Sequence, residues 1–372
     1  MSDNPIQLYR ERTEGISRQK EYRVMALLTF CVAVALPVVR LISYYLPIRS
    51  DLVSDLVFTL LMQVGVLIGI PVLFYKFALK KNVRGMLDFS GFHAAKWYNL
   101  ALAVPIGLCC HIVTIGVSSI WQSIISALGY SHGSSPMPET FSAGTMVLTL
   151  VLTGVLPGFC EEFFNRGGLL KTVRGSYPFH FAIILMGLEF GLFHQNITQV
   201  FYTALFGAYM AFLALKTKSV FPCMIIHFVN NSFSVINDYC DEYGFMRGGL
   251  YRLINQTAAT RPQLLTVAFF LFCGILVGLT ILLLHLNSAR RLAKKKEVIA
   301  SSGYDHTNKR VVLLGEEDKE KVRELGLDKE VYGHTLKEDL YKPTLADNAF
   351  FLGAIAVCVL TTVFSFIFGW IV

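Results

Sequence analysis

The feature that most constrains this chain is a series of long runs of predominantly apolar residues. About 20 such residues in helical form cross the hydrocarbon core of a bilayer, so each run is a candidate membrane span. The runs are residues 24–46, 53–78, 97–127, 143–172, 179–196, 199–216, 219–237, 263–287 and 347–371. We predict an all-α fold, a polytopic transmembrane helix bundle of eight or nine spans, because only a short polar stretch separates the fifth and sixth runs.

The composition agrees with a bilayer environment. Hydrophobic residues make up 54% of the chain and charged residues 16%, whereas about a quarter of the residues in soluble domains are charged. This composition excludes intrinsic disorder, a disulfide-stapled secreted module and a conventional cytosolic enzyme. The net charge of +7 does not indicate nucleic acid as a partner, because Lys and Arg gather in the cytoplasmic loops of membrane proteins.

The distribution of basic residues predicts the orientation of the chain. Basic residues follow the second, fourth, sixth and eighth runs, which alternation places on one side of the membrane. The loops assigned to the other side, such as 128–142 and 238–246, are poor in Lys and Arg or acidic. By the positive-inside rule we predict a multi-pass protein of the cell membrane with a cytoplasmic N-terminus.

The fourth run carries three charged side chains, and each costs at least about 2.5–3.5 kcal/mol inside a span. Glu162 and Arg166 are four residues apart and can pair on a helix, whereas Glu161 points about 100° away. We also predict a helix break at Pro157 and Gly158. A triad that only fixes packing is the simpler interpretation, but polar packing between membrane helices usually relies on Ser, Thr or Asn. We favour a functional interpretation, in which the free carboxylate acts as a general base.

Two later runs each carry a histidine with a companion one helical turn away. Phe190 and His194 share one face of the fifth run, and His227 and Asn231 share one face of the seventh. A lone histidine in an apolar helix is more often structural than functional. Two histidines and a free carboxylate on three helices can converge on one water, as in a hydrolytic zinc site or a carboxylate-activated water.

The fifth run also contains a third acidic residue, Glu189, with no obvious partner in the sequence. It can line the same cavity, stay protonated or mark an access path, and we rank it below Glu161 and Glu162 as a functional residue. On the same run, Gly187 and Gly191 predict the close approach of a neighbouring helix.

The order EExxxR, FxxxH and HxxxN on three separate helices resembles the CAAX protease and bacteriocin-processing family of intramembrane endopeptidases. The matching residues are Glu161, Glu162 and Arg166, then Phe190 and His194, then Pro222, His227 and Asn231. The eukaryotic branch of that family includes the Ras-converting endopeptidase, which removes three residues after a prenylated cysteine. Bacterial branches process peptides or confer bacteriocin immunity.

The resemblance implies a role for each motif. Glu161 and His194 would bind and activate the attacking water, and Glu162 with Arg166 would organise the site. His227 and Asn231 would stabilise the tetrahedral oxyanion. The family is read either as a zinc enzyme, with Glu161, His194 and His227 as metal ligands, or as a metal-independent glutamate-type protease, and the sequence does not decide between them.

The chain is therefore predicted to contain a catalytic core with additional segments around it. The core is 143–237, preceded by a cytoplasmic tail and three spans in 1–142, and followed by a loop and the eighth span in 238–287. A cytoplasmic insertion in 288–346, with a charged amphipathic helix from Glu316 to Leu327, precedes the final span in 347–372.

The resulting functional hypothesis is an intramembrane endopeptidase. Its partners would be the lipid bilayer and a membrane-associated peptide or lipid-linked protein tail. A proton-coupled transporter is the main alternative, but carriers usually show an internal repeat and none is visible. A catalytically silent immunity or scaffold protein of the same fold is the third, and the intact motif set argues against it.

Overall fold

The computed structural model describes residues 18–45, 51–131, 142–243, 260–301, 304–305, 310–311 and 340–371. These residues are helical almost throughout, and the strands among them are two-residue segments, β1 (Tyr304–Asp305) and β2 (Arg310–Val311), which pair antiparallel. The predicted all-α fold is confirmed. The predicted helix from Glu316 to Leu327 and parts of the two predicted outer loops lie outside the described residues.

Two compact units make up the chain. One consists of Met1–Leu276 with Tyr341–Val372, and the other of Val277–Leu340. The helix α14 (Pro262–Ser301) begins in the first unit and ends in the second, which also contains β1 and β2. Every residue of the predicted site belongs to the first unit.

Seven helices in the described part of the chain are long and apolar enough to cross a membrane. They are Arg18–Ser43, Val53–Ala78, Trp97–Ala127, Ala143–Ser176, Ile197–Thr217, Gln263–Glu297 and Leu345–Phe368. A polytopic bundle is confirmed, but this number is smaller than the eight or nine spans that the sequence predicts. The helices by themselves do not indicate which side of the membrane either end faces, so the cytoplasmic N-terminus stays a prediction.

The difference in number comes from the fifth and seventh predicted spans. Both form helices, α10 (Phe179–Phe193) and α12 (Phe221–Tyr243). With 15 residues, α10 is about 22 Å long, which is shorter than the hydrocarbon core of about 30 Å. The sequence of α12 contains a histidine and several asparagines, and these lower its hydropathy. These two helices nevertheless carry half of the motif residues.

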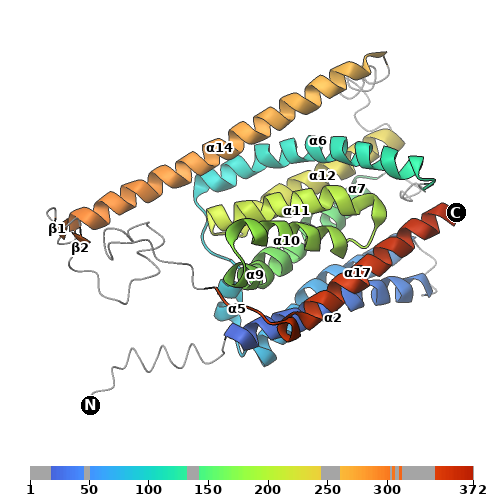
Figure 1. Cartoon of the computed structure of the whole chain (residues 1–372). Helices are drawn as coiled ribbons and strands as arrows, with labels where there is room; N and C mark the ends of the chain where they lie inside the picture. Colours follow the sequence, from blue (N-terminus) through green and yellow to red (C-terminus); the bar gives the residue numbers. More distant parts are fainter. Residues whose placement is uncertain are drawn as a thin grey trace. The chain divides into compact units, whose positions relative to one another are not determined.

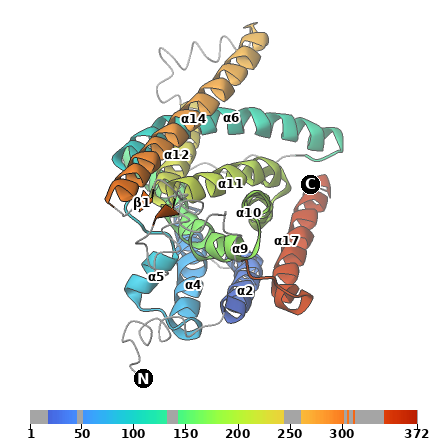
Figure 2. The same cartoon turned by 60° about the vertical axis from the view of Figure 1, so that its left-hand side comes forward.

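The helices of the first unit pack in pairs (Figure 1). The C-terminal helix α17 (Leu345–Ile371) lies along α2 (Arg18–Tyr45), and α6 (Trp97–Ala127) lies along α12. Helix α10 packs against α11 (Ile197–Thr217) and also contacts α17 (Figure 2).

Glycines allow the close approach of α10 and α11. A Cβ atom on Gly187 would lie 2.7 Å from the carbonyl oxygen of Ala204, and one on Gly191 would lie 2.5 Å from that of Val200. Real Cβ atoms do not come so close to backbone atoms, so any larger residue would push the helices apart. The close approach predicted from these two glycines is confirmed.

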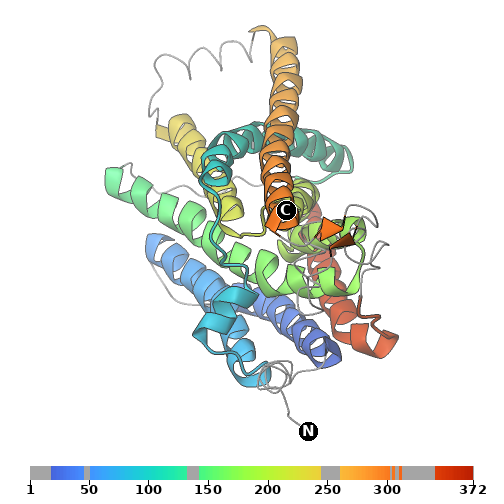
Figure 3. The same cartoon turned by 90° about the vertical axis from the view of Figure 1, so that its left-hand side faces the viewer.

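The helix that carries the EExxxR motif extends over Ala143–Ser176 and is irregular. It consists of α7 (Ala143–Thr149), the π-helical η3 (Leu150–Val155), α8 (Leu156–Glu162), the π-helical η4 (Phe163–Leu169) and α9 (Leu170–Ser176). Figure 3 shows it, in green, running beside the blue segment of residues 51–78, which includes η1 (Leu61–Gly69).

The predicted break at Pro157 and Gly158 is wrong. The chain stays helical there because Pro157 lies in the first turn of α8, directly after a π-helical segment, where a missing backbone N–H is tolerated. The non-helical backbone occurs further on, at Gly167, with φ −77° and ψ −121°. A kink there follows the motif directly and lies within the π-helical segment that contains Arg166.

Candidate active site

Three motif residues form one buried ionic cluster. The Arg166 Nε atom lies 3.2 Å from Glu162 Oε2, and both side chains are fully buried. The other oxygen, Glu162 Oε1, lies 2.9 Å from Nδ1 of His227 on α12. Because a carboxylate accepts, Nδ1 of His227 carries a proton and donates it to Glu162. The pairing of Glu162 with Arg166 predicted from their spacing is confirmed, and Glu162 also joins two helices.

Arg166 is held by contacts to two further helices. Its Nη2 donates to the carbonyl oxygen of Gly207 on α11 at 3.2 Å. Its guanidinium lies over the Phe190 ring of α10, 4.3 Å from the ring centre. A planar cation over an aromatic face is attracted by the negative face of the ring, and a guanidinium can stack and pair at the same time. Arg166 therefore contacts α10, α11 and Glu162 with a single side chain.

Glu161 points away from this cluster and into a cavity of about 480 Å³. Its side chain is 16% exposed, and its Oε2 lies 4.0 Å from Nε2 of His227. The cavity is lined by residues from α6, α8, α10, α11 and α12, and the lining includes the predicted site residues Glu161, His194, His227 and Asn231. The structure therefore brings all four to one hollow, while Glu162 and Arg166 lie behind it.

His194 follows the last residue of α10, and its orientation is set by its own helix. Its Nδ1 lies 2.8 Å from the carbonyl oxygen of Phe190, and a carbonyl can only accept, so Nδ1 carries the proton. The Phe190 ring packs edge-on against the His194 ring, with centroids 4.9 Å apart. The other ring nitrogen, Nε2, is then the one that remains for a ligand in the cavity.

Asn231 is held at the cavity wall by two contacts. Its Nδ2 donates to the carbonyl oxygen of Thr153 at 3.0 Å, and its Oδ1 accepts from Asn230 at 3.0 Å. One N–H of the Asn231 amide is left over by these contacts, because an amide nitrogen carries two protons. Asn230 is itself tied to α6, where Thr114 donates to its Oδ1 at 3.2 Å.

A second lobe, of about 380 Å³, meets the first at Glu161 and His194. Two of its lining residues, Gln63 and Arg40, were not found by the sequence reasoning. Gln63 donates to Glu161 Oε1 at 3.0 Å, and Arg40 donates through Nη2 to the carbonyl oxygen of His194 at 2.9 Å. Both are polar residues inside apolar runs, and that signal could have identified them.

Glu189 does not line the cavity that contains Glu161, which answers one of the alternatives that the sequence left open. It lies beside a separate, mostly apolar cavity on another side of α10. The three acidic residues predicted near the site thus have three different surroundings. Glu162 is paired, Glu161 faces the polar cavity, and Glu189 faces the apolar one.

The residues that would hold a metal ion are Glu161, His194 and His227, a carboxylate and two imidazoles of the types that bind zinc. In the described part of the chain, no three His, Cys, Asp or Glu side chains form a group that could hold one metal ion. Glu161, His194 and His227 line the same cavity. Nδ1 of His194 and of His227 are both engaged by oxygen acceptors, an arrangement that leaves Nε2 of each ring as the possible ligand atom. These three side chains are not drawn together into one ligand group in the described residues, and the mechanism below assigns roles to side chains alone.

No curated protein and no solved structure matches this chain. One protein family does match, and its description is type II CAAX prenyl endopeptidase Rce1-like. The match covers residues 143–233, which include the whole ionic cluster and the four residues that line the polar cavity. The match of residues 143–233 to this family model agrees with the resemblance that the three ordered motifs predict.

Proposed function

We propose that this protein is an intramembrane endopeptidase that hydrolyses a peptide bond in a membrane-associated peptide or protein tail. The observation that carries the proposal is that Glu161, His194, His227 and Asn231 line one cavity, with His227 held from behind by Glu162. The family match, whose description names a prenyl endopeptidase, supports the same reaction class.

In the proposed mechanism, a water molecule binds between Glu161 and Nε2 of His194. Glu161 takes a proton from the water as the water oxygen attacks the scissile carbonyl carbon, which produces a tetrahedral intermediate. The carbon–nitrogen bond then breaks, and the proton passes from Glu161 to the leaving amine. One water is consumed, and the products are a new carboxyl terminus and a new amino terminus.

The developing oxyanion is stabilised from the other side of the cavity. Nε2 of His227 and Oε2 of Glu161 lie 4.0 Å apart. One oxygen atom of the tetrahedral intermediate can therefore lie at a hydrogen-bonding distance of about 2.8 Å from each of them. When protonated, His227 donates from Nε2 to the oxyanion, and the carboxylate of Glu162 at Nδ1 stabilises that cation. The remaining N–H of Asn231 is a second donor in the same wall.

Arg40 indicates how the substrate tail is recognised. Among the described residues that line the second lobe, Arg40 is the one whose side chain carries a permanent positive charge. One of its five N–H groups is used by the carbonyl oxygen of His194. We propose that the remaining donors bind the free C-terminal carboxylate of the substrate, so that the scissile bond, a few residues upstream, reaches Glu161.

The test uses two synthetic peptides with a farnesylated cysteine followed by three residues, one ending in a free carboxylate and one in an amide. We expect the purified full chain in lipid nanodiscs to cleave the peptide with the free carboxylate after its prenylated cysteine. Its kcat/KM should be about tenfold or more above that of the peptide that ends in an amide. In Arg40→Gln, which keeps a polar side chain but removes the charge, this ratio is expected to fall toward one. Mass spectrometry of the products measures both the site of cleavage and the rate of cleavage of each peptide.

The outcomes separate two claims. Equal cleavage of acid and amide by the unmodified protein would contradict the role of Arg40 and leave the endopeptidase proposal intact. If the protein cleaves neither of the two prenylated peptides and none of the unprenylated controls, the endopeptidase proposal itself is contradicted.

We expect activity to survive treatment with a strong chelator, because Asn231 lies one turn after His227 in the wall of the same cavity, which suits an oxyanion-binding pair better than a ligand with its second shell. Elemental analysis of purified active protein measures the metal content directly. About one zinc per chain, lost together with activity in His194→Ala, would instead assign Glu161, His194 and His227 as metal ligands.

A further inference from the structure

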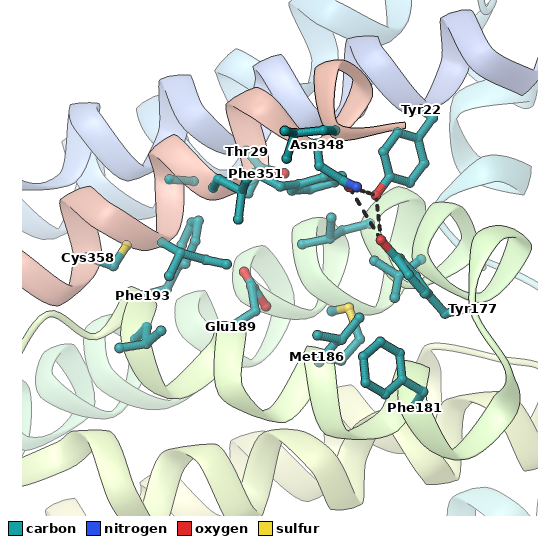
Figure 4. A pocket seen from close by; sticks show the side chains of 18 residues that line it. Tyr22, Thr29, Tyr177, Phe181, Met186, Glu189, Phe193, Asn348, Phe351 and Cys358 are labelled. Carbon is teal, nitrogen blue, oxygen red and sulfur yellow. Dashed lines mark hydrogen bonds between the residues drawn. The ribbon is translucent and has the colours of Figure 1, made fainter. Parts of the chain in front are cut away.

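A second cavity, of about 390 Å³, lies outside the proposed active site. It is enclosed by α2, α9, α10 and α17, and its lining is predominantly apolar (Figure 4). It shares no lining residue with the cavity that contains Glu161 and His194, and only Phe193 with the second lobe. Helix α17 also lies outside the residues that match the endopeptidase family. The motif residues therefore do not account for this cavity.

One acidic side chain faces this apolar space. Figure 4 shows Glu189 between Phe193 and Met186, pointing toward the α17 side of the cavity. Both of its carboxyl oxygens are buried and have no hydrogen-bond partner among the described residues. The described lining contains no Lys, Arg or His that could pair with it. A buried carboxyl group without a partner is destabilising, and a ligand that supplies a partner would relieve that cost.

The other polar side chains of the lining are already satisfied. At one end, the hydroxyl groups of Tyr22 and Tyr177 both donate to Oδ1 of Asn348, at 2.5 and 3.3 Å (Figure 4). Elsewhere, Thr29 donates to a backbone carbonyl of its own helix, and the Cys358 sulfur accepts from Gln195. The contacts at Asn348 join α17 to α2 and to Tyr177, the residue that follows α9. Glu189 is different, because its polar atoms are directed into the cavity without a partner.

The cavity opens between two apolar helices. Four of its lining residues are also exposed at the protein surface, Phe181 on α10 and Leu345, Leu352 and Ile355 on α17. Helix α17 is a candidate membrane span, and α10 is a shorter apolar helix. A molecule entering here therefore comes from the hydrocarbon region of the bilayer, and the cavity volume falls within the usual pocket range of about 300–1,000 Å³.

We propose that this cavity binds a membrane lipid or lipid-like molecule with an aliphatic chain and a primary amine. The amine pairs with the carboxyl group of Glu189 and supplies the cation that the lining lacks. The chain occupies the apolar surface between α10 and α17. This proposal does not depend on peptidase activity, because no residue of the proposed catalytic machinery takes part.

The test uses a photoreactive hexadecylamine and, as matched probes, the alcohol and the carboxylic acid of the same chain length. The full chain in phosphatidylcholine nanodiscs is irradiated with each probe, and the labelled peptides are identified by mass spectrometry. We expect the amine to label α10 and α17 about tenfold or more above the acid, because only the amine gains a charge-assisted contact. Glu189→Leu should remove this preference, whereas Leu188→Gln, a polar change at an exposed neighbour outside the cavity, should retain it.

Thermal unfolding provides a measurement that does not depend on labelling. A ligand that binds only the folded state raises Tm, so hexadecylamine should raise the Tm of the unmodified protein and not that of Glu189→Leu. Equal labelling by the amine and the acid would overturn the proposal, and so would amine labelling that Glu189→Leu leaves unchanged. The comparison of amine and acid in the unmodified protein remains decisive even if the variant does not fold.

Discussion

Replacing Glu161 with glutamine, or His194 with alanine, is expected to lower peptide cleavage about 100-fold or more, because each change removes a group that holds or deprotonates the attacking water. In Glu161→Gln the side chain keeps its size, and its amide oxygen can still accept from Gln63, which bonds Oε1 at 3.0 Å in the native protein. Loss of activity in this variant would therefore report the missing base rather than a collapsed cavity. Cleavage of the farnesylated peptide in nanodiscs measures the effect.

A control for these variants exists on α10, the helix that precedes His194. His180 lies at the start of that helix, is exposed and lines none of the three cavities described above. His180→Ala should therefore keep the activity of the native protein, and all variants should yield the same amount of membrane-inserted protein. If Glu161→Gln or His194→Ala keeps more than about a tenth of native turnover, the assignment of water activation is wrong.

Arg166→Lys is expected to lower kcat about tenfold or more while the protein still inserts into the membrane. Lysine retains the charge, but it cannot pair with Glu162, donate to Gly207 and stack over Phe190 at the same time. Glu162 would then lose its fixed position, and with it the orientation of His227. Small displacements of a catalytic group can cost about 100-fold in rate. Steady-state kinetics measure kcat and KM separately.

The kinetic pattern distinguishes positioning from packing. A positioning role predicts a lower kcat with little change in KM, and Arg174→Lys, further along the same helix and away from both lobes, should change neither. Native activity in Arg166→Lys would refute the geometric role. Loss of membrane-inserted protein in Arg166→Ala would support the simpler interpretation, in which the cluster only fixes helix packing.

The fold could largely be predicted from the lengths of the apolar runs. Every predicted span forms a helix, because a bilayer leaves a spanning backbone few other ways to satisfy its hydrogen bonds. Helices α10 and α12 were predicted as spans, but α10 is too short and α12 too polar to be among the seven candidate spans. The π-helical segments around Pro157 also escaped prediction, because they depend on neighbouring helices rather than on local propensity.

Within the site, the sequence by itself determined which side chains of one helix lie on the same face. Residues four apart lie on the same helix face, so the pairs Glu162 with Arg166 and Phe190 with His194 follow from spacing alone. The direction of Glu161, about 100° away from that of Glu162, follows in the same way. The order of the three motifs was sufficient to indicate the family.

Only the tertiary structure decided which helices meet and how each is rotated about its axis. It joined Glu162 to His227 across 65 positions of sequence, and brought Gln63 and Arg40 from the first two helices to the second lobe. It also separated Glu189 from Phe190, its neighbour in the chain, and gave each a different cavity. Adjacent helical residues point about 100° apart, so what each one contacts depends on the packing of the whole bundle.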